Sequence, residues 1–244
     1  MNEKEFNEKL FQKDFWFSPS WVIDTFNYYV DAEEQRTKNR FEAIQSVRRK
    51  RNSKKLKEMW AVAVFLLGYE KMTANPHWLQ PCIDTAPDAL GVCLIPHRKV
   101  EKSHTQAQIF IEVTEWDNHT TQDLFERIKD KLSNKSYPEF YHLVVHITRQ
   151  GIVQTDMDAI SEQLIKISPR LAGIWIVVGS SKPKIQDNYL VACLFPIKAK
   201  YEFSYSKAVT DDRKNKIPSV MKIERGKGDN FYDLKMIRYS LPSL

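Results

Sequence analysis

The most informative stretch of this chain is AQIFIEVTEW, which runs from Ala107 to Trp116. Its content of Ile, Val and Phe is typical of a β-strand. A second apolar run, ALGVCLI, spans Ala89 to Ile95, and the polar residues 96–104 between the two runs indicate a turn. Two such runs joined by a polar connection predict an antiparallel hairpin.

A glutamate stands in the middle of the second strand. Because successive side chains of a strand point to opposite faces, Phe110, Glu112 and Thr114 are expected on one face. A carboxylate within an apolar strand costs free energy unless something pairs with it. A divalent metal ion is one such partner, and a buried lysine or arginine is another. Glu112 is therefore a candidate functional residue.

Helices and strands alternate outward from this hairpin. Residues 1–75 are predicted to be helical, with the aromatic residues from Phe15 packed in an N-terminal turn. After the hairpin we expect a helix, a strand, a helix and two strands, at residues 120–132, 141–148, 155–167, 171–178 and 189–195. Thr120, with Asp123 three residues later, is expected to cap the first of these helices. This order predicts an α/β (α+β) fold with a mixed central sheet flanked by helices.

Three segments are expected along the chain. They are an N-terminal helical segment at 1–55, an α/β core at 56–196, and a basic C-terminal segment at 197–244 that packs on the core. Only 7 of the 244 residues are glycine, where average usage would give roughly 17. Neither GxGxxG nor GxxxxGK[ST] occurs, which argues against dinucleotide-binding and P-loop enzymes.

The net charge of +6 is concentrated at the two ends. Residues 1–60 carry 13 basic and 10 acidic groups and residues 197–244 carry 11 and 6, whereas residues 61–196 carry 13 and 15. Basic flanks suit a polyanion such as DNA, and ordinary surface charge gives the same pattern. The densest basic run supplies the candidate nucleic-acid-binding residues Arg48, Arg49, Lys50, Arg51, Lys54 and Lys55. Such a run also suits a solvated helix face.

The cellular context is predicted from what the sequence contains. No apolar run approaches the ~18 residues needed to span a bilayer, so no membrane association is expected. The first residues are charged rather than apolar, and the cysteine count of three is odd. Both features favour the reducing cytoplasm. A homo-oligomer is compatible with the sequence.

The acidic positions of the hairpin resemble a known motif. Pro87-Asp88 precedes the first strand, and Glu112-Val113-Thr114 lies in the second. This arrangement resembles the PD-(D/E)XK superfamily of restriction-endonuclease-like nucleases, and so does the order of a leading helix, a hairpin, a helix and a strand. The resemblance implies a restriction-endonuclease-like core over 56–196 that hydrolyses DNA phosphodiester bonds with Mg²⁺. It also implies that Asp88 and Glu112 are metal ligands, with Glu70 of the leading helix as a third.

The sequence departs from this motif at one position. Thr114 occupies the place of the family's catalytic lysine, and a threonine cannot supply a positive charge. Some members of the family carry the lysine on the following helix, where this chain has Lys129 and Lys131, and Lys129 is taken as the candidate catalytic residue with Asp88, Glu112 and the substituted Thr114. Two interpretations remain open: a metal-dependent nuclease that uses Lys129 or Lys131, and an inactive relative that binds nucleic acid or protein.

A pair of histidines offers a different metal site. His142 and His146 form an HxxxH pattern, which binds zinc when it lies on a helix. The surrounding residues are predicted to form a strand, which would separate the two side chains by roughly 13 Å. We therefore expect no metal ion to be shared between them.

Overall fold

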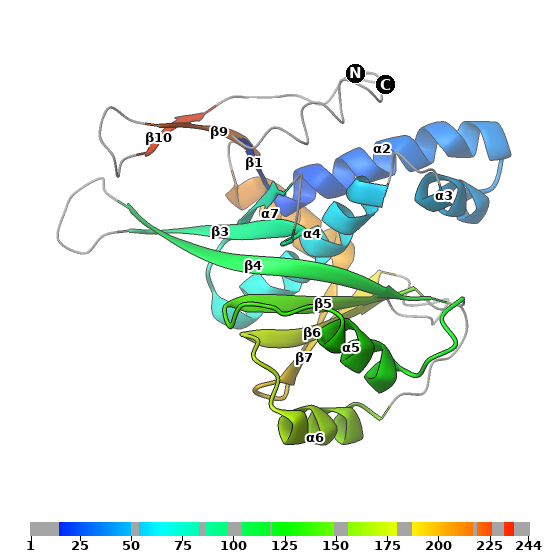
Figure 1. The fold of residues 1–244 in the computed structure, drawn as a ribbon. Helices are drawn as coiled ribbons and strands as arrows, with labels where there is room; N and C mark the ends of the chain where they lie inside the picture. Colours follow the sequence, from blue (N-terminus) through cyan, green and yellow to red (C-terminus); the bar gives the residue numbers. More distant parts are fainter. Residues whose placement is uncertain are drawn as a thin grey trace.

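Ten strands form one sheet in the part of the chain that the computed structural model describes, residues 15–49, 54–82, 86–96, 104–117, 119–148, 156–179, 187–216, 219–225 and 232–236. The strands are β1 (Phe15–Phe17), β2 (Trp78–Pro81), β3 (Ala89–Pro96), β4 (His104–Trp116), β5 (Tyr141–Ile147), β6 (Gly173–Gly179), β7 (Asn188–Phe195), β8 (Ala199–Ser204), β9 (Val220–Arg225) and β10 (Tyr232–Met236). Their order across the sheet is β10-β9-β1-β2-β3-β4-β5-β6-β7-β8 (Figure 1).

The sheet is mixed, as the sequence predicted. The expected hairpin is confirmed, because β3 and β4 are antiparallel and Ala89 lies opposite Ile111. Strands β4, β5 and β6 are parallel to one another. Parallel neighbours need a crossover connection, and here two helices supply it, α5 (Leu124–Ser133) and α6 (Met157–Ile167).

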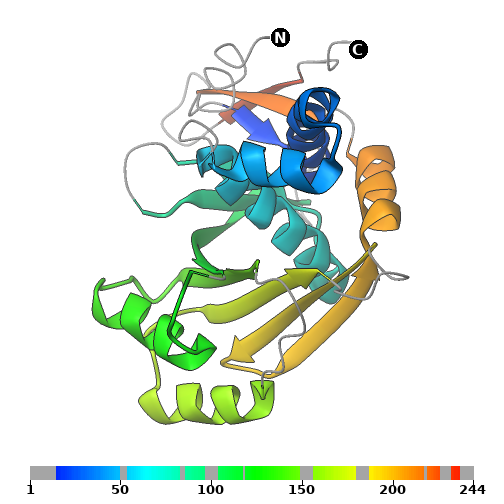
Figure 2. The same cartoon turned by 90° about the vertical axis from the view of Figure 1, so that its right-hand side faces the viewer.

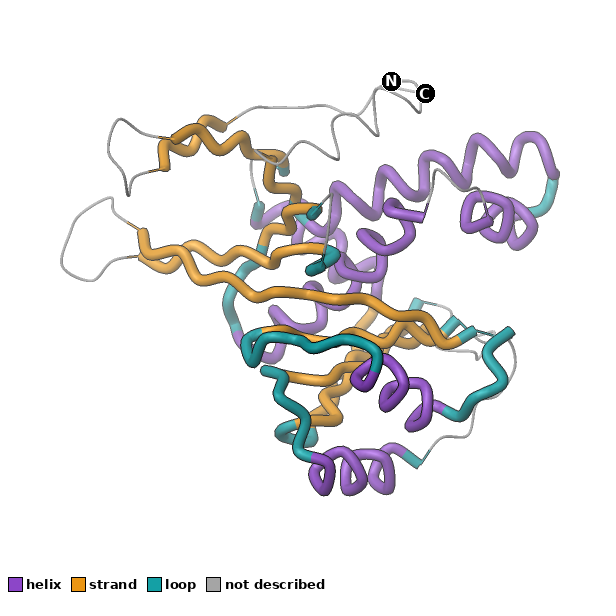
Figure 3. Tube along the Cα trace, in the orientation of Figure 1, coloured by secondary structure: helices purple, strands orange, loops and turns teal. Residues whose placement is uncertain are grey.

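Helices cover both faces of the sheet (Figures 2 and 3). On one face α4 (Lys54–Thr73) and α7 (Tyr205–Asn215) contact the strands, and α2 (Pro19–Thr37) and α3 (Arg40–Arg49) pack outside α4. The core on this face includes Ile111 and Val113 of β4. The opposite face packs against α5 and α6, and its core includes Trp116. The alternation of side chains along β4 therefore directs Glu112 and Thr114 toward the α5 side.

Helix α4 runs between the sheet and the outer helices. Its residues from Met59 to Leu67 are all buried, which leaves its polar side chains near its two ends. A helix that is apolar on all sides is typical of a fully covered position. The first turns of α4 therefore present the polar residues that reach the hairpin.

Two local predictions are wrong. Phe15–Phe17 is a strand rather than a turn, and it pairs with β9 and β2. Its partners lie far away in the sequence, so local periodicity could not reveal the pairing. Thr120 does not cap α5, because its hydroxyl donates to Asp117 Oδ1 at 2.8 Å. Asp123 is the cap, and its side chain accepts a hydrogen bond from the Glu126 amide at 2.8 Å.

The three predicted segments meet in the same sheet. The N-terminal segment contributes β1, and the C-terminal segment contributes β8, β9 and β10. The C-terminal segment also packs α7 against α2, where Arg213 Nη2 lies 2.7 Å from Asp24 Oδ1. Among the described helices, none has the length and apolar character required to cross a membrane.

Candidate active site

A pocket lies at the point where β3 separates from β4. The ladder between these strands begins at the pair Ala89 and Ile111, so β4 continues from Glu112 to Trp116 without β3 beside it. The amide of Val113 in this open stretch donates to Asp88 Oδ2 at 2.8 Å. Asp88 therefore satisfies a backbone donor that the ladder leaves unpaired, as buried amides require.

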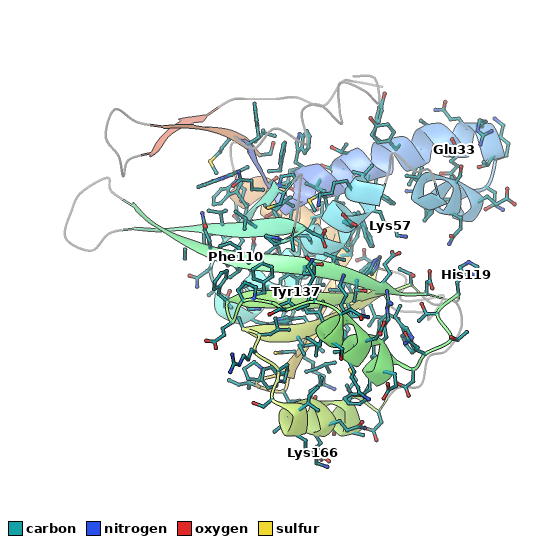
Figure 4. The ribbon with its side chains drawn as sticks, viewed as in Figure 1. Glu33, Lys57, Phe110, His119, Tyr137 and Lys166 are labelled. Atoms are coloured by element: carbon teal, nitrogen blue, oxygen red, sulfur yellow. The ribbon has the colours of Figure 1, made fainter. Side chains whose placement is uncertain are left out.

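The pocket has a volume of about 460 Å³ and receives residues from both sides of β4. Helix α4 contributes its first turns, the hairpin contributes Asp88 and the open stretch of β4, and α5 contributes two basic residues. Figure 4 shows Lys57 on the α4 side of β4 and Tyr137 on the α5 side. The lining residues are Lys57, Glu58, Ala61, Asp88, Glu112, Val113, Thr114, Glu115, Arg127, Lys131 and His146.

Glu112 is the most buried carboxylate of the pocket, with 4% of its surface exposed. Its Oε1 atom lies 3.2 Å from Lys131 Nζ and 2.9 Å from Lys135 Nζ. Its Oε2 atom is shielded from solvent and receives no hydrogen bond of normal geometry from the described residues. Two lysines thus hold one oxygen, and the second oxygen is left to interact with a cation or a donor.

Tyr137 lies beside the two carboxylates, in the connection that follows α5. Burial raises the pKa of its hydroxyl well above the usual value, and the negative charges of Glu112 and Asp88 and a hydrogen bond with Glu112 raise it further. The hydroxyl therefore stays protonated and serves only as a neutral donor or acceptor near Glu112.

Thr114, two residues beyond Glu112, has an uncharged side chain, and the guanidinium of Arg127 lies next to it. Arg127 of α5 donates from Nη2 to Thr114 Oγ1 at 3.1 Å, and from Nε to the Glu115 carbonyl at 3.3 Å. Because Arg127 and Lys131 are four residues apart on a helix, both side chains point toward β4. Helix α5 therefore places two cations opposite Glu112 and Thr114.

The α4 side of the pocket contains a separate charged cluster. Glu115 pairs with Lys57, and its Oε1 atom lies 3.7 Å from His146 Nδ1. The His146 ring packs on Trp60, with ring centroids 5.2 Å apart. Burial tends to raise the pKa of Glu115, but the hydrogen bonds and charges of His146 and Lys57 outweigh it and lower the pKa to about 2.

This lowered pKa predicts how stability depends on pH. The folded-state pKa of Glu115 is about 2 against an ordinary value of 4.5, so its contribution is present above pH 4.5 and is lost as the pH falls toward 2. We expect the wild type to lose on the order of 2 kcal/mol more unfolding free energy than Glu115→Gln over that interval. Denaturant unfolding of both proteins at several pH values measures this difference, and a pH-independent difference would contradict it.

Known proteins offer no match to this chain. No protein-family model matches the chain, and no curated protein or solved structure matches it. The chemistry of the pocket is therefore inferred from its own residues and distances.

The structure brings three of the predicted catalytic and metal-binding residues together. Asp88, Glu112 and Thr114 line the pocket, and so does Lys131, one of the two lysines considered as substitutes. The other, Lys129, is about half exposed and pairs with Glu126 on the surface of α5, 3.3 Å away. The helical repeat explains the difference, because residues two apart on a helix face different directions.

Glu70 lies in a different part of α4. It follows Glu58 by twelve residues, which is ~18 Å along a helix axis. Glu70 pairs with the buried Lys216 and accepts a hydrogen bond from the His77 amide at 2.7 Å. Burial raises the pKa of Glu70 to about 7. The structure does not bring Glu70 together with the carboxylates of the pocket.

One member of the predicted basic run reaches the pocket edge. Lys55 Nζ donates to the Asp88 carbonyl at 2.8 Å, and it lies 3.4 Å from Glu58 Oε2. Arg48 and Arg49 lie at the end of α3, and Lys54 begins α4. The structure describes the backbone of these three residues but not their side chains. Lys50 and Arg51 lie outside the described residues altogether. His142 lies against Trp175 rather than with His146 in the pocket.

Several pocket residues were not predicted from the sequence. Glu58 is the carboxylate that α4 contributes, and Glu70 was preferred only by its position along the chain. These two are the acidic residues of α4, so the direction in which α4 crosses the hairpin decides between them. Arg127 gave a weak signal, because it precedes Lys131 by four residues. Lys135 contacts Glu112 but does not line the pocket, and nothing in the sequence indicated it.

The donor set of the pocket suits magnesium. In the described part of the chain no group of three or more Asp, Glu, His or Cys residues has the geometry to hold a metal ion. Mg²⁺ is usually held by one or two carboxylates and completes its shell with water and substrate phosphate. Asp88 and Glu112 provide two carboxylates; Asp88 Oδ1 lies 3.6 Å from Lys55 Nζ, and Glu112 Oε2 is buried near the Tyr137 hydroxyl. The number of carboxylates therefore matches what Mg²⁺ usually takes from a protein.

Proposed function

We propose that this protein is a metal-dependent nuclease that hydrolyses DNA phosphodiester bonds. The convergence of Asp88, Glu112 and Lys131 in one pocket at the open stretch of β4 carries the proposal. The order α4, β2-β3-β4, α5, β5 also supports it, since a leading helix, a hairpin that bears the acids, a helix and a strand are what the PD-(D/E)XK resemblance requires. A restriction-endonuclease-like core is part of this proposal.

Hydrolysis adds water across a phosphorus–oxygen bond. The hydroxyl of the water joins phosphorus, and its proton ends on the departing sugar oxygen. A bound Mg²⁺ ion supplies the charge that lowers the pKa of the attacking water and neutralises charge on the phosphate. Asp88 and Glu112 are the residues that would hold this ion.

The lysine of α5 has an orienting role in this proposal. An ammonium group has three donors and no acceptor. Lys131, 3.2 Å from Glu112 Oε1, can donate both to this carboxylate and to a water molecule beside it. It thereby fixes the direction of the water without having to accept a proton.

DNA is the partner in this proposal because of the distribution of charge. The flanks at 1–60 and 197–244 carry net charges of +3 and +5, and binding of a polyanion to such regions releases condensed counterions. The free thiols Cys82, Cys93 and Cys193 are consistent with a reducing compartment, so the proposal includes a cytoplasmic location.

DNA binding is therefore expected to be strongly salt-dependent. The affinity for duplex DNA, measured without divalent metal, should fall linearly on a log–log plot as salt rises, with a slope of about −0.9 per neutralised phosphate. Fluorescence anisotropy with a labelled duplex provides the measurement. Folded protein that binds no DNA at low salt would contradict DNA as the partner.

One observation favours a second function. Lys131 and Lys135 already compensate the negative charge of Glu112 through its Oε1 atom, so the protein itself pairs this buried carboxylate without a metal ion. The alternative is a catalytically inactive relative of the same fold that binds nucleic acid or protein. Incubating labelled duplex, branched and single-stranded DNA with Mg²⁺, with Mn²⁺ and with EDTA separates the two. Cleavage that requires the metal supports the nuclease, and binding without cleavage supports the alternative.

A further inference from the structure

We propose that Arg127 is a catalytic residue of this pocket, whose guanidinium binds the scissile phosphate where the family's strand lysine would stand. This inference rests on the proposed nuclease function. The phosphate-binding cation is then an arginine on a helix, whereas the sequence motif places a lysine on the strand.

The ion pairs of the pocket single out this residue. Lys57 pairs with Glu115, and Lys131 pairs with Glu112. Arg127 contacts only neutral oxygens, the Thr114 hydroxyl and the Glu115 carbonyl. No carboxylate of the described residues forms an ion pair with it. Among the described residues that line the pocket, Arg127 is therefore the cation that no carboxylate of the protein neutralises.

The geometry of these contacts leaves the guanidinium ready for an anion. A guanidinium has five N–H donors in a rigid planar fork. The hydrogen bonds from Nε and Nη2 use two donors and fix the plane of the group. The three remaining donors have no partner among the described residues. A planar fork of this kind matches two oxygens of a phosphate.

The position of Arg127 also fits the reaction. It stands one helical turn before Lys131 and next to Thr114, which is two residues beyond Glu112 on the same strand face. A phosphate held near Asp88 and Glu112 would thus meet Lys131 and Arg127 together. Negative charge grows on the phosphate oxygens as water attacks, and a cation fixed beforehand stabilises that charge without reorganising.

The first test compares Arg127→Ala and Arg127→Lys with a charge-matched control, Lys166→Ala. Lys166 is exposed near the end of α6 and points away from the sheet (Figure 4). With Mg²⁺, we expect Arg127→Ala to lower kcat by about 100-fold or more. Arg127→Lys should fall between this variant and the wild type, because it keeps the charge and loses the fork. Lys166→Ala should cleave at the wild-type rate.

The second test does not depend on cleavage. With EDTA present, we measure the affinity for a short DNA duplex over a range of salt concentrations. Arg127→Ala should bind DNA more weakly because it loses one phosphate contact. The slope of log affinity against log salt should decrease in magnitude by about one. Lys166→Ala should leave the slope unchanged. Thermal unfolding of each variant confirms that it is folded.

Thr114 is a positioning residue in this scheme, because its hydroxyl accepts from Arg127. Thr114→Val should lower kcat, whereas Thr114→Ser should keep kcat close to the wild-type value, since serine keeps the acceptor. A purely steric role would give the opposite order, because valine has the shape of threonine. That order would overturn the role of the hydroxyl.

The outcomes separate this inference from the nuclease proposal. Metal-dependent cleavage that Arg127→Ala leaves intact, with an unchanged salt slope, overturns the role of Arg127 and keeps the nuclease. If the wild type cleaves no DNA, the nuclease proposal and the catalytic role of Arg127 both fail. In that case a reduced salt slope for Arg127→Ala would still show that Arg127 contacts a phosphate of the bound DNA, without a catalytic role.

Discussion

Replacing Glu112 with alanine or glutamine is expected to abolish metal-dependent DNA cleavage, with a loss of at least about a thousandfold. The reason is its position, since Glu112 is a buried carboxylate that lines the pocket together with Asp88. Without this carboxylate, the ion that activates water and neutralises the phosphate loses a ligand. Initial rates of cleavage at saturating Mg²⁺ measure the effect.

A matched control keeps this result interpretable. Glu162 is exposed on α6, so Glu162→Gln should retain the wild-type rate. Metal binding provides a readout independent of cleavage, because a ligand that binds only the folded state raises its stability. Mg²⁺ or Mn²⁺ should raise the Tm of the wild type and of Glu162→Gln but not that of Glu112→Gln. Cleavage that survives both changes at Glu112 would mean that the active site lies elsewhere.

Replacing Lys131 with alanine should cost about 100-fold in kcat, whereas Lys129→Ala should cleave at close to the wild-type rate. Lys131 lies 3.2 Å from Glu112 within the pocket, and Lys129 pairs with Glu126 at the surface. The two variants remove the same charge from the same helix, so their difference reports position. Single-turnover rates measure the chemical step directly.

Folding is not expected to obscure the comparison. Glu112 keeps an ion pair with Lys135 when Lys131 is removed, at 2.9 Å, so no buried carboxylate is left alone. Lys135→Ala is a useful third variant, because it removes a cation that contacts Glu112 from outside the pocket. Comparing it with Lys131→Ala separates pairing with Glu112 from a place in the pocket. A larger loss for Lys129→Ala than for Lys131→Ala would overturn the assignment of the lysine.

Local pattern predicted the elements that carry the site. The apolar run around Glu112 and its alternation predicted a strand, and the polar connection after Ile95 predicted the hairpin. Both predictions depend on short-range rules, because side-chain alternation and turn composition are properties of neighbouring residues. The same rules predicted that Glu112 and Thr114 share a face. They failed for Phe15–Phe17, whose three residues become a strand only through pairing with β9 and β2.

The sequence by itself determined which strand face carries Glu112 and Thr114, and that position 114 carries a threonine rather than a cation. Only the tertiary structure decided what surrounds them. The direction of α4 across the hairpin brings Glu58 to the pocket and carries Glu70 to the cluster with Lys216. The packing of α5 selects Lys131 over Lys129 and places Arg127 beside Thr114. Which side chains meet across two packed elements depends on crossing direction and rotation, and neither is contained in the periodicity of a single element.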